Sequence, residues 1–203
     1  MAGKVIRSPF GVKTKISSLN KLDLKSSIKS NASLSLFSIN SLISWIHLSK
    51  PELLTEVIGR CVKLKADVVV EDEREGGKRR ILNFGHTIGH AVESYSILSK
   101  EINKLKHGEA IAVGLITELY ISHKIHGFDY KNLLSIKKEL LGNFKKISFT
   151  TSDQKEIFKI MSYDKKNYNN KVKYVLLKGI GNPIIDQDVD NELFFKAFDF
   201  YNE

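Results

Sequence analysis

The first firm pattern of apolar and polar positions begins near residue 49. Ser49-Lys50-Pro51-Glu52 has the form of a helix capping box with proline in the first turn. The apolar residues that follow recur at the spacing of one helix face: Leu53, Leu54, Val57, Ile58, Cys61 and Leu64. The pattern predicts a helix that buries this face, with the lone cysteine on it.

Two further helical patterns lie between residues 79 and 127. In residues 79–95 the apolar side chains fall on one side of a helix with 3.6 residues per turn. A second helix is expected to open at His107 and to end near Gly127. The core-facing positions of the first helix are Ile81, Phe84, Ile88, Ala91, Val92 and Tyr95.

The last third of the chain mixes helical and strand patterns. Helices are expected over residues 129–141 and from Asp153, whose side chain is a candidate N-cap. The segments KVKYVLLKGIG and NPIIDQDVD carry β-branched residues around glycines and predict a short β-hairpin. A final amphipathic helix follows, capped by Asp188 or Asp190. The fold class predicted is mainly α, with a short β-hairpin near the C-terminus.

Composition and net charge exclude several classes of protein for this chain. Residues 1–41 are rich in Ser and Lys with short apolar clusters and are expected to be loosely structured, whereas residues 42–203 form the helical domain. The net charge of +9 is spread along the chain without a nucleic-acid-binding motif, so no nucleic-acid partner is expected. No apolar run approaches the ~18–20 residues that span a bilayer, and no secretory signal is recognisable. The single cysteine suits a reducing cytoplasm.

The polar side of residues 79–95 has an unusual composition. Arg79, Asn83, His86, His90 and Glu93 share one narrow stripe where Lys, Glu and Gln would be ordinary. Two glycines beside the stripe, at positions 85 and 89, each cost roughly 1 kcal/mol against Ala in a helix. They predict close approach of a ligand or of another backbone.

Histidine spacing makes this stripe a candidate metal site. His86 and His90 stand at i and i+4, which lets two imidazoles meet one ion, although such a pair is more often an ordinary surface pair. His107 is expected near a helix N-terminus, where imidazole stays neutral and able to bind metal. Glu109 lies in the same turn, and it serves either the helix dipole or the chemistry.

The sequence DEREGGKRRILNFGHTIGHAVES, followed by LKHGEAIAVGL, resembles the C-terminal, metal- and substrate-binding domain of 3-dehydroquinate synthase. The similarity runs from about Ile43 to the C-terminus. It implies a two-domain enzyme, in which an N-terminal α/β domain that this chain lacks binds NAD. The implied reaction converts 3-deoxy-arabino-heptulosonate 7-phosphate to 3-dehydroquinate and phosphate in the shikimate pathway.

The resemblance also implies roles for individual residues. His86 and His107 match the histidine ligands of a divalent metal, Zn²⁺ or Co²⁺, and His90 matches a histidine that handles protons and contacts substrate. This overrides the pairing of His86 with His90 that spacing alone suggests. Arginine and lysine suit a polyanionic substrate, and Glu75 matches a polar position near the active site. The positions that match substrate-contacting residues are Lys65, Arg79, Asn83 and either Lys165 or Lys166.

One metal ligand of the family is missing from its expected place. The family pattern has a glutamate in a Glu-Val-Ile-Lys motif, and the nearest match here is Lys4-Val5-Ile6-Arg7. A cation at that position would repel a metal ion rather than bind it. The sequence therefore does not identify the third metal ligand.

Two classes of function follow. In the first, the chain is the metal- and substrate-binding half of a dehydroquinate synthase, a carbon-oxygen lyase that is inactive alone. Its expected partners are an anionic sugar phosphate and either a second copy in a homodimer or a separate NAD-binding chain. In the second, it is a non-catalytic helical remnant or interaction module. A different sugar-phosphate cyclase is a third alternative.

Overall fold

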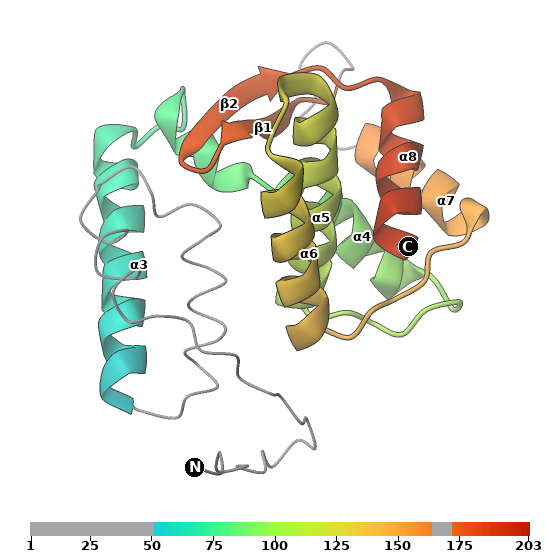
Figure 1. Cartoon of the computed structure of the whole chain (residues 1–203), viewed down its shortest axis with the longest axis horizontal. Helices are drawn as coiled ribbons and strands as arrows, with labels where there is room; N and C mark the ends of the chain where they lie inside the picture. The colour runs from blue at the N-terminus through green and yellow to red at the C-terminus, as the bar shows by residue number, and fades with distance from the viewer. Residues whose placement is uncertain (1–50, 164–171) are drawn as a thin grey trace. The chain divides into compact units, whose positions relative to one another are not determined.

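The computed structural model describes residues 51–163 and 172–203, so the segment 1–41 lies outside the described residues. The observed elements confirm the predicted mainly helical fold with a short hairpin near the C-terminus (Figure 1). In chain order they are α3 (Pro51–Glu71), the 3-10 helix η1 (Lys78–Asn83), α4 (His86–Leu98), α5 (His107–His126), α6 (Tyr130–Asn143), α7 (Thr151–Ser162), β1 (Tyr174–Gly179), β2 (Asn182–Gln187) and α8 (Asn191–Asn202).

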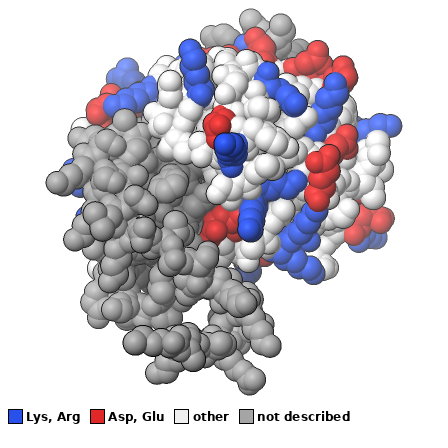
Figure 2. All heavy atoms as spheres, in the orientation of Figure 1, with Lys and Arg blue, Asp and Glu red and all other residues white. Residues whose placement is uncertain are grey.

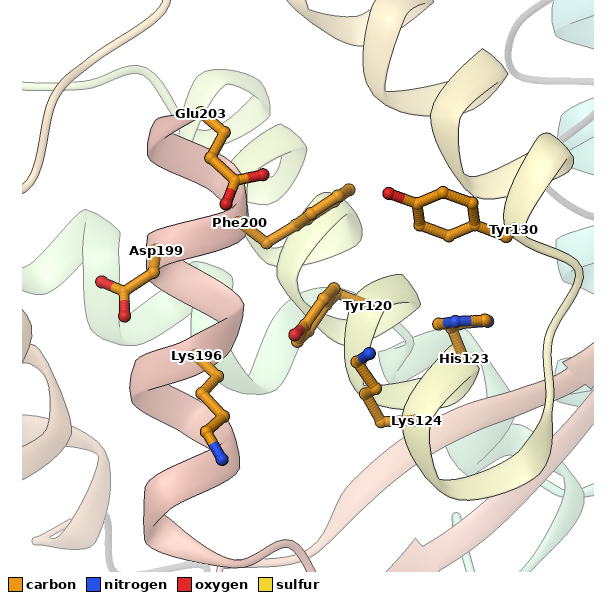
Figure 3. Close-up of a pocket in the computed structure, with 8 residues that line it drawn as sticks. All are labelled: Tyr120, His123, Lys124, Tyr130, Lys196, Asp199, Phe200 and Glu203. Atoms are coloured by element: carbon orange, nitrogen blue, oxygen red, sulfur yellow. The ribbon is translucent and has the colours of Figure 1, made fainter.

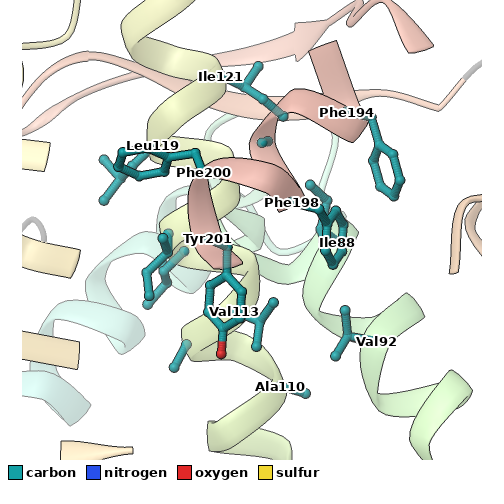
Figure 4. Packing of buried hydrophobic residues seen from close by; sticks show 14 of the residues in the cluster. Ile88, Val92, Ala110, Val113, Leu119, Ile121, Phe194, Phe198, Phe200 and Tyr201 are labelled. Carbon is teal, nitrogen blue, oxygen red and sulfur yellow. The ribbon is translucent and has the colours of Figure 1, made fainter. Parts of the chain in front are cut away.

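Helix α5 is the central element of the core. Every residue from 112 to 119 is buried, as expected of a helix that is apolar on nearly all sides. Helices α4, α6 and α8 and strand β1 pack around it. Figure 4 shows side chains from α4, α5 and α8 in this core, including Ile88, Val113 and Phe198. Its predicted bounds, from His107 to a stop at Gly127, are confirmed.

Glycines set the close approach of α4 to α5. A Cβ atom on Gly114 would lie 1.9 Å from the carbonyl oxygen of Gly85 and 2.7 Å from the backbone nitrogen of Gly89. A Cβ atom on Gly89 would lie 3.2 Å from Cα of Ile111. The two glycines that the sequence marked for close approach therefore face another backbone, that of α5.

The prediction of a single helix over residues 79–95 is wrong. Helix η1 ends at Asn83, and α4 begins at His86 after Gly85 adopts φ of 79°. This left-handed conformation carries little penalty for glycine. The backbone N–H groups of Gly85 and Ile88 donate to the carboxylate of Glu118 on α5. This long-range contact fixes a new helix start that the local pattern does not reveal.

Local capping determines where α7 and α8 begin. The backbone N–H of Glu192 donates to Asp190 at 2.8 Å, so Asp190 rather than Asp188 caps α8. The predicted N-cap of α7, Asp153, is wrong, because Thr150 holds that position. Asp153 lies three residues into the capping box and accepts the Thr150 backbone N–H at 2.7 Å. Asp153 also accepts the hydroxyl of Tyr95, which links α7 to α4.

The hairpin packs against α5. Strands β1 and β2 pair antiparallel, and the turn between them contains Gly181 at φ of 78°. The first four residues of β1 are buried. The Leu177 backbone N–H donates to the Ser122 hydroxyl at 2.9 Å, which anchors the hairpin on the central helix.

Helix α3 buries little of its apolar face in the described part of the chain. Cys61 is exposed, so the expectation of a buried thiol is wrong. Ile58 and Val62 are 51% and 63% exposed, and none of these three belongs to the core cluster. Among the described helices, none is both long enough and apolar enough to cross a membrane.

Candidate metal and anion site

Three histidines from two helix starts converge. His86 is the first residue of α4, His90 lies one turn further, and His107 is the first residue of α5. One ring nitrogen from each lies within 4.8 Å of the others. The ring centroids of His86 and His90 are 5.2 Å apart, and each is 5.7 Å from that of His107. The structure therefore brings together all three histidines that the sequence singled out.

Hydrogen bonds fix the tautomers of two of these rings. Nδ1 of His86 lies 3.1 Å from the carbonyl oxygen of Phe84, which can only accept. Nδ1 of His107 lies 3.0 Å from a carboxylate oxygen of Glu93. Each Nδ1 therefore donates its proton, which leaves the lone pair of Nε2 for a metal ion. This arrangement is typical of the second shell of histidine metal sites.

Glu118 orients the start of α4 from within the core. Its side chain is 0% exposed and accepts the backbone N–H of Gly85 at 2.6 Å and of Ile88 at 3.1 Å. Burial raises the pKa of Glu118 to about 8, while hydrogen bonds from the α4 N-terminus oppose the increase. Sequence reasoning assigned Glu118 no role. The available signal was a carboxylate in the middle of the apolar run of α5.

A groove of about 1080 Å³ opens beside these histidines. His86 and His90 line it together with Asn83, whose amide donates to Glu75 at 3.0 Å. Glu75 has a φ of 55°, which is unusual for a residue with a side chain. Lys165 and Lys166 lie outside the described residues, although Tyr163 and Val172, on either side of residues 164–171, line the groove. The remaining lining residues include Thr87, Ser94, Lys173, Tyr174 and Asp186.

The arginine that lines the groove is not the one that the resemblance indicated. Arg79 donates to the carbonyl oxygen of Glu73 at 3.0 Å and is not among the lining residues. Arg80 does line the groove, where it pairs with Asp186. Its Nε is buried without a hydrogen-bond partner in the described part of the chain. Lys65, exposed on α3, does not line the groove either.

A second, smaller hollow of about 360 Å³ lies between α5, α6 and α8 (Figure 3). Tyr120 and Phe200 stack there with ring centroids 4.7 Å apart, and Lys124 lies over the Tyr120 ring. None of the predicted site residues lines this hollow.

Basic residues do not form a single patch on the face in Figure 2, where blue and red side chains alternate over the described residues.

Comparison with known proteins identifies relatives of this chain. The family described as "3-dehydroquinate synthase C-terminal" matches residues 25–167. The chain is 36% identical over 183 residues to 3-dehydroquinate synthase of Parabacteroides distasonis, covering 90% of this chain and 49% of that protein. It is 40% identical over 146 residues to 3-dehydroquinate synthase of Listeria welshimeri, covering 71% and 38% respectively. The chain therefore spans half or less of the length of these relatives.

Solved structures of sugar-phosphate cyclases have a similar fold. A 2-deoxy-scyllo-inosose synthase in complex with carbaglucose-6-phosphate, NAD⁺ and Co²⁺ matches with a TM-score of 0.60 and 29% identity, covering 73% of this chain and 41% of that one. ValA, the 2-epi-5-epi-valiolone synthase from Streptomyces hygroscopicus subsp. jinggangensis 5008 with NAD⁺ and Zn²⁺ bound, matches with a TM-score of 0.64. At 18% identity, over 84% of this chain and 48% of that one, this second likeness concerns the fold alone.

Proposed function

Because the chain belongs to the 3-dehydroquinate synthase family, through that family's C-terminal domain, we propose that it supplies the metal- and substrate-binding half of such an enzyme. The reaction is the conversion of 3-deoxy-arabino-heptulosonate 7-phosphate to 3-dehydroquinate and phosphate, a carbon-oxygen lyase step of the shikimate pathway in the cytoplasm. NAD is held by a domain outside the described residues, by a separate chain or by a homodimeric partner. On this proposal, the metal- and substrate-binding half alone does not convert the substrate.

The convergence of His86 and His107 is the observation that carries this proposal. Both rings present Nε2 lone pairs from helix starts, with Nδ1 held by Phe84 and Glu93. Neutral imidazole is a good ligand for Zn²⁺ and Co²⁺, so the residues present fit the metal that the family implies. When bound, such an ion polarises the hydroxyl and carbonyl that are interconverted in the reaction.

The groove beside the histidines supplies groups for an anionic sugar. Asn83 offers an amide, and its contact with Glu75 holds it at the groove wall. Arg80 and Lys173 line the same groove and provide positive charge. His90 also lines it, one turn beyond His86, at the position where the resemblance implies proton handling and substrate contact. Lys65, Arg79, Lys165 and Lys166 remain substrate-binding candidates by resemblance.

A reconstitution experiment tests the proposed function. The full 203-residue chain is assayed for phosphate release from the heptulosonate phosphate with NAD and Co²⁺, alone and with the separately produced N-terminal half of the Parabacteroides distasonis relative. We expect release only in the mixture, and none when His86 or His107 is replaced by Ala. Release by the chain alone would overturn its assignment as an inactive half. Failure to bind the substrate with metal present would overturn the proposal as a whole.

Two alternatives are separable by experiment. A non-catalytic remnant would release no phosphate in the reconstituted mixture, whether or not it binds a metal ion or an anion. The second alternative is a different sugar-phosphate cyclase, and the likeness to the 2-deoxy-scyllo-inosose synthase supports it. Competition between the heptulosonate phosphate and carbaglucose-6-phosphate for the Co²⁺-loaded chain distinguishes such a cyclase from a dehydroquinate synthase. The dehydroquinate synthase assignment requires that the heptulosonate bind more tightly.

A further inference from the structure

We propose that the hollow between α5, α6 and α8 is a second binding site, which takes a small zwitterion with a flat apolar group, such as an aromatic α-amino acid. Its volume of about 360 Å³ is within the range of sites for small molecules. Among the described residues, it shares no lining residue with the groove beside the histidines. His107 begins α5 and His123 lies in its last turn, so the two sites are about 24 Å apart along this helix. Binding in the hollow is therefore independent of the proposed reaction.

Aromatic rings form the apolar part of the hollow. Tyr120 and Phe200 stack with ring centroids 4.7 Å apart and an interplanar angle of 22°. Figure 3 shows Tyr130, from the start of α6, opposite the Phe200 ring, and this tyrosine is 47% exposed. A flat group that enters the hollow therefore meets rings from three helices. Aromatic contacts of this kind contribute more than the burial of their area alone.

Two of the four charged side chains that line the hollow are bonded elsewhere. The Lys196 ammonium lies 2.6 Å from the Glu192 carboxylate within α8. Asp199 accepts a hydrogen bond from the Gln154 amide at 3.4 Å, and its carboxylate points away from the hollow in Figure 3. These two groups therefore contribute little to a ligand.

The other two charged side chains, Lys124 and Glu203, have opposite signs and do not pair. Neither of them forms an ion pair with another described residue. The Lys124 ammonium lies 5.2 Å from the centroid of the Tyr120 ring. Figure 3 shows Lys124 and Glu203 on opposite sides of the Tyr120 and Phe200 rings. A ligand with both a carboxylate and an ammonium group complements the two charges, whereas a simple anion or cation also meets a charge of its own sign.

His123 and Tyr130 add neutral hydrogen-bonding groups. Nδ1 of His123 lies 2.7 Å from the carbonyl oxygen of Phe128, which can only accept. Nδ1 therefore carries the proton, and Nε2 is an acceptor. The His123 and Tyr130 rings are 5.1 Å apart, so both belong to the same wall of the hollow. An acceptor nitrogen in this wall favours a ligand that carries an N–H donor, as the zwitterion does.

Matched ligands test the proposal on the full chain, with L-phenylalanine as the probe. Binding is followed by shifts of the protein amide resonances in NMR titrations, and a dissociation constant on the order of 1 mM is expected for a small ligand in an open hollow. Phenylacetate lacks the ammonium group, phenethylamine lacks the carboxylate and L-alanine lacks the ring. Each is expected to bind at least about 3-fold more weakly. Absence of saturable L-phenylalanine binding up to about 20 mM would overturn the proposal.

Two variants assign the ends of the ligand, and circular dichroism verifies that each is folded. Lys124→Gln and Glu203→Gln are each expected to weaken L-phenylalanine binding by about 3–10-fold. Lys124→Gln should also abolish the preference for L-phenylalanine over phenethylamine, and Glu203→Gln the preference over phenylacetate, as in a double-mutant cycle. Lys155→Gln is the matched control, because this exposed lysine of α7 does not line the hollow, and it should bind like the unmodified chain. Preferences that persist in both variants, or an equal loss in Lys155→Gln, would overturn the site.

Discussion

The backbone N–H of Gly85 donates a 2.6 Å hydrogen bond to the buried carboxylate of Glu118, 33 residues further along the chain. This bond, with the one from Ile88 at 3.1 Å, satisfies N–H groups that a helix start would otherwise leave unpaired. His86 lies between the two donors. The orientation of a candidate metal ligand therefore depends on a carboxylate from the interior of the next helix.

Removing this carboxylate is expected to loosen both the fold and the site. Glu118→Ala leaves two backbone N–H groups buried without acceptors, at a cost of about 1–3 kcal/mol each. We expect the free energy of unfolding in urea to fall by about 2–6 kcal/mol. At temperatures where the variant remains folded, Zn²⁺ affinity should also fall, because the start of α4 is no longer fixed.

The control for this change is a core truncation in the first turn of α6, which follows the C-terminal end of α5, whereas His107 begins α5. Leu133→Ala removes a buried side chain and is expected to cost a comparable amount, about 2–5 kcal/mol. It should leave Zn²⁺ affinity unchanged. Equal loss of metal binding in both variants would mean that Glu118 acts only through global stability.

We expect the free energy of unfolding to depend on pH through the ionisation of Glu118. Burial raises the pKa of this carboxyl from 4.5 to about 8, so between these values the folded chain retains a proton that the unfolded chain releases. The stabilising contribution is full below about pH 4.5 and is lost as pH rises to about 8, with a slope of at most about 1.4 kcal/mol per pH unit. Chemical denaturation at pH 5, 6, 7 and 8 measures it.

Subtracting the same curve for Glu118→Gln isolates this group, because every other side chain is the same in both proteins. Tyr174 on β1 is the titratable group close to Glu118. Burial, with a smaller effect of Glu118, raises the pKa of Tyr174, so this phenol stays neutral over the range. A difference curve that is flat from pH 5 to 8 would contradict the predicted shift.

Two glycine-to-alanine changes in helices should have opposite effects on the stability of the fold. Gly114→Ala places a Cβ atom 1.9 Å from the Gly85 carbonyl oxygen, so α4 and α5 must separate, at a cost of more than about 3 kcal/mol. Gly142→Ala in α6 meets nothing within 4 Å and should stabilise the protein by up to about 1 kcal/mol. Thermal unfolding of the two variants measures both. Similar melting temperatures would refute the close helix contact.

Local patterns were sufficient to predict most elements, because their signals lie within a few residues. The start of α5 at His107, its end at Gly127 and the hairpin around Gly181 are examples. The interruption at Gly85 was missed, because residues 79–95 also satisfy a continuous helical pattern. The competing interaction comes from Glu118, and the sequence does not show that this carboxylate points into the core.

Individual site residues were predicted unevenly for a related physical reason. Helix spacing predicted only that His86 and His90 lie together. The resemblance to the family, and not spacing, predicted that His107 shares a site with His86, and the structure groups all three rings. The arginine was harder to predict, because Arg79 and Arg80 are adjacent and only the geometry of η1 determines which one faces the groove. Cys61 was placed on a buried face because periodicity reveals an apolar stripe but not whether anything covers it.

The two adjacent arginines give the last prediction. Arg80 lines the groove with a buried Nε that has no partner among the described residues, whereas Arg79 is bonded to the Glu73 carbonyl. A guanidinium hydrogen bond to an anion contributes about 1.5–3 kcal/mol. Arg80→Ala should therefore weaken binding of the heptulosonate phosphate to the Co²⁺-loaded chain by about 10–100-fold, as measured by calorimetry, and Arg79→Ala should weaken it less.

Arg80→Lys serves as the conservative variant. It keeps the positive charge but loses the planar fork that can hold two anion oxygens at once, so an intermediate loss is expected. Arg80 also pairs with Asp186, and Asp186→Asn removes that pairing while leaving the guanidinium in place. If Asp186→Asn weakens ligand binding as much as Arg80→Ala does, the arginine supports the groove wall instead of contacting the anion. A larger loss in Arg79→Ala than in Arg80→Ala would return the role to the residue that the resemblance indicated.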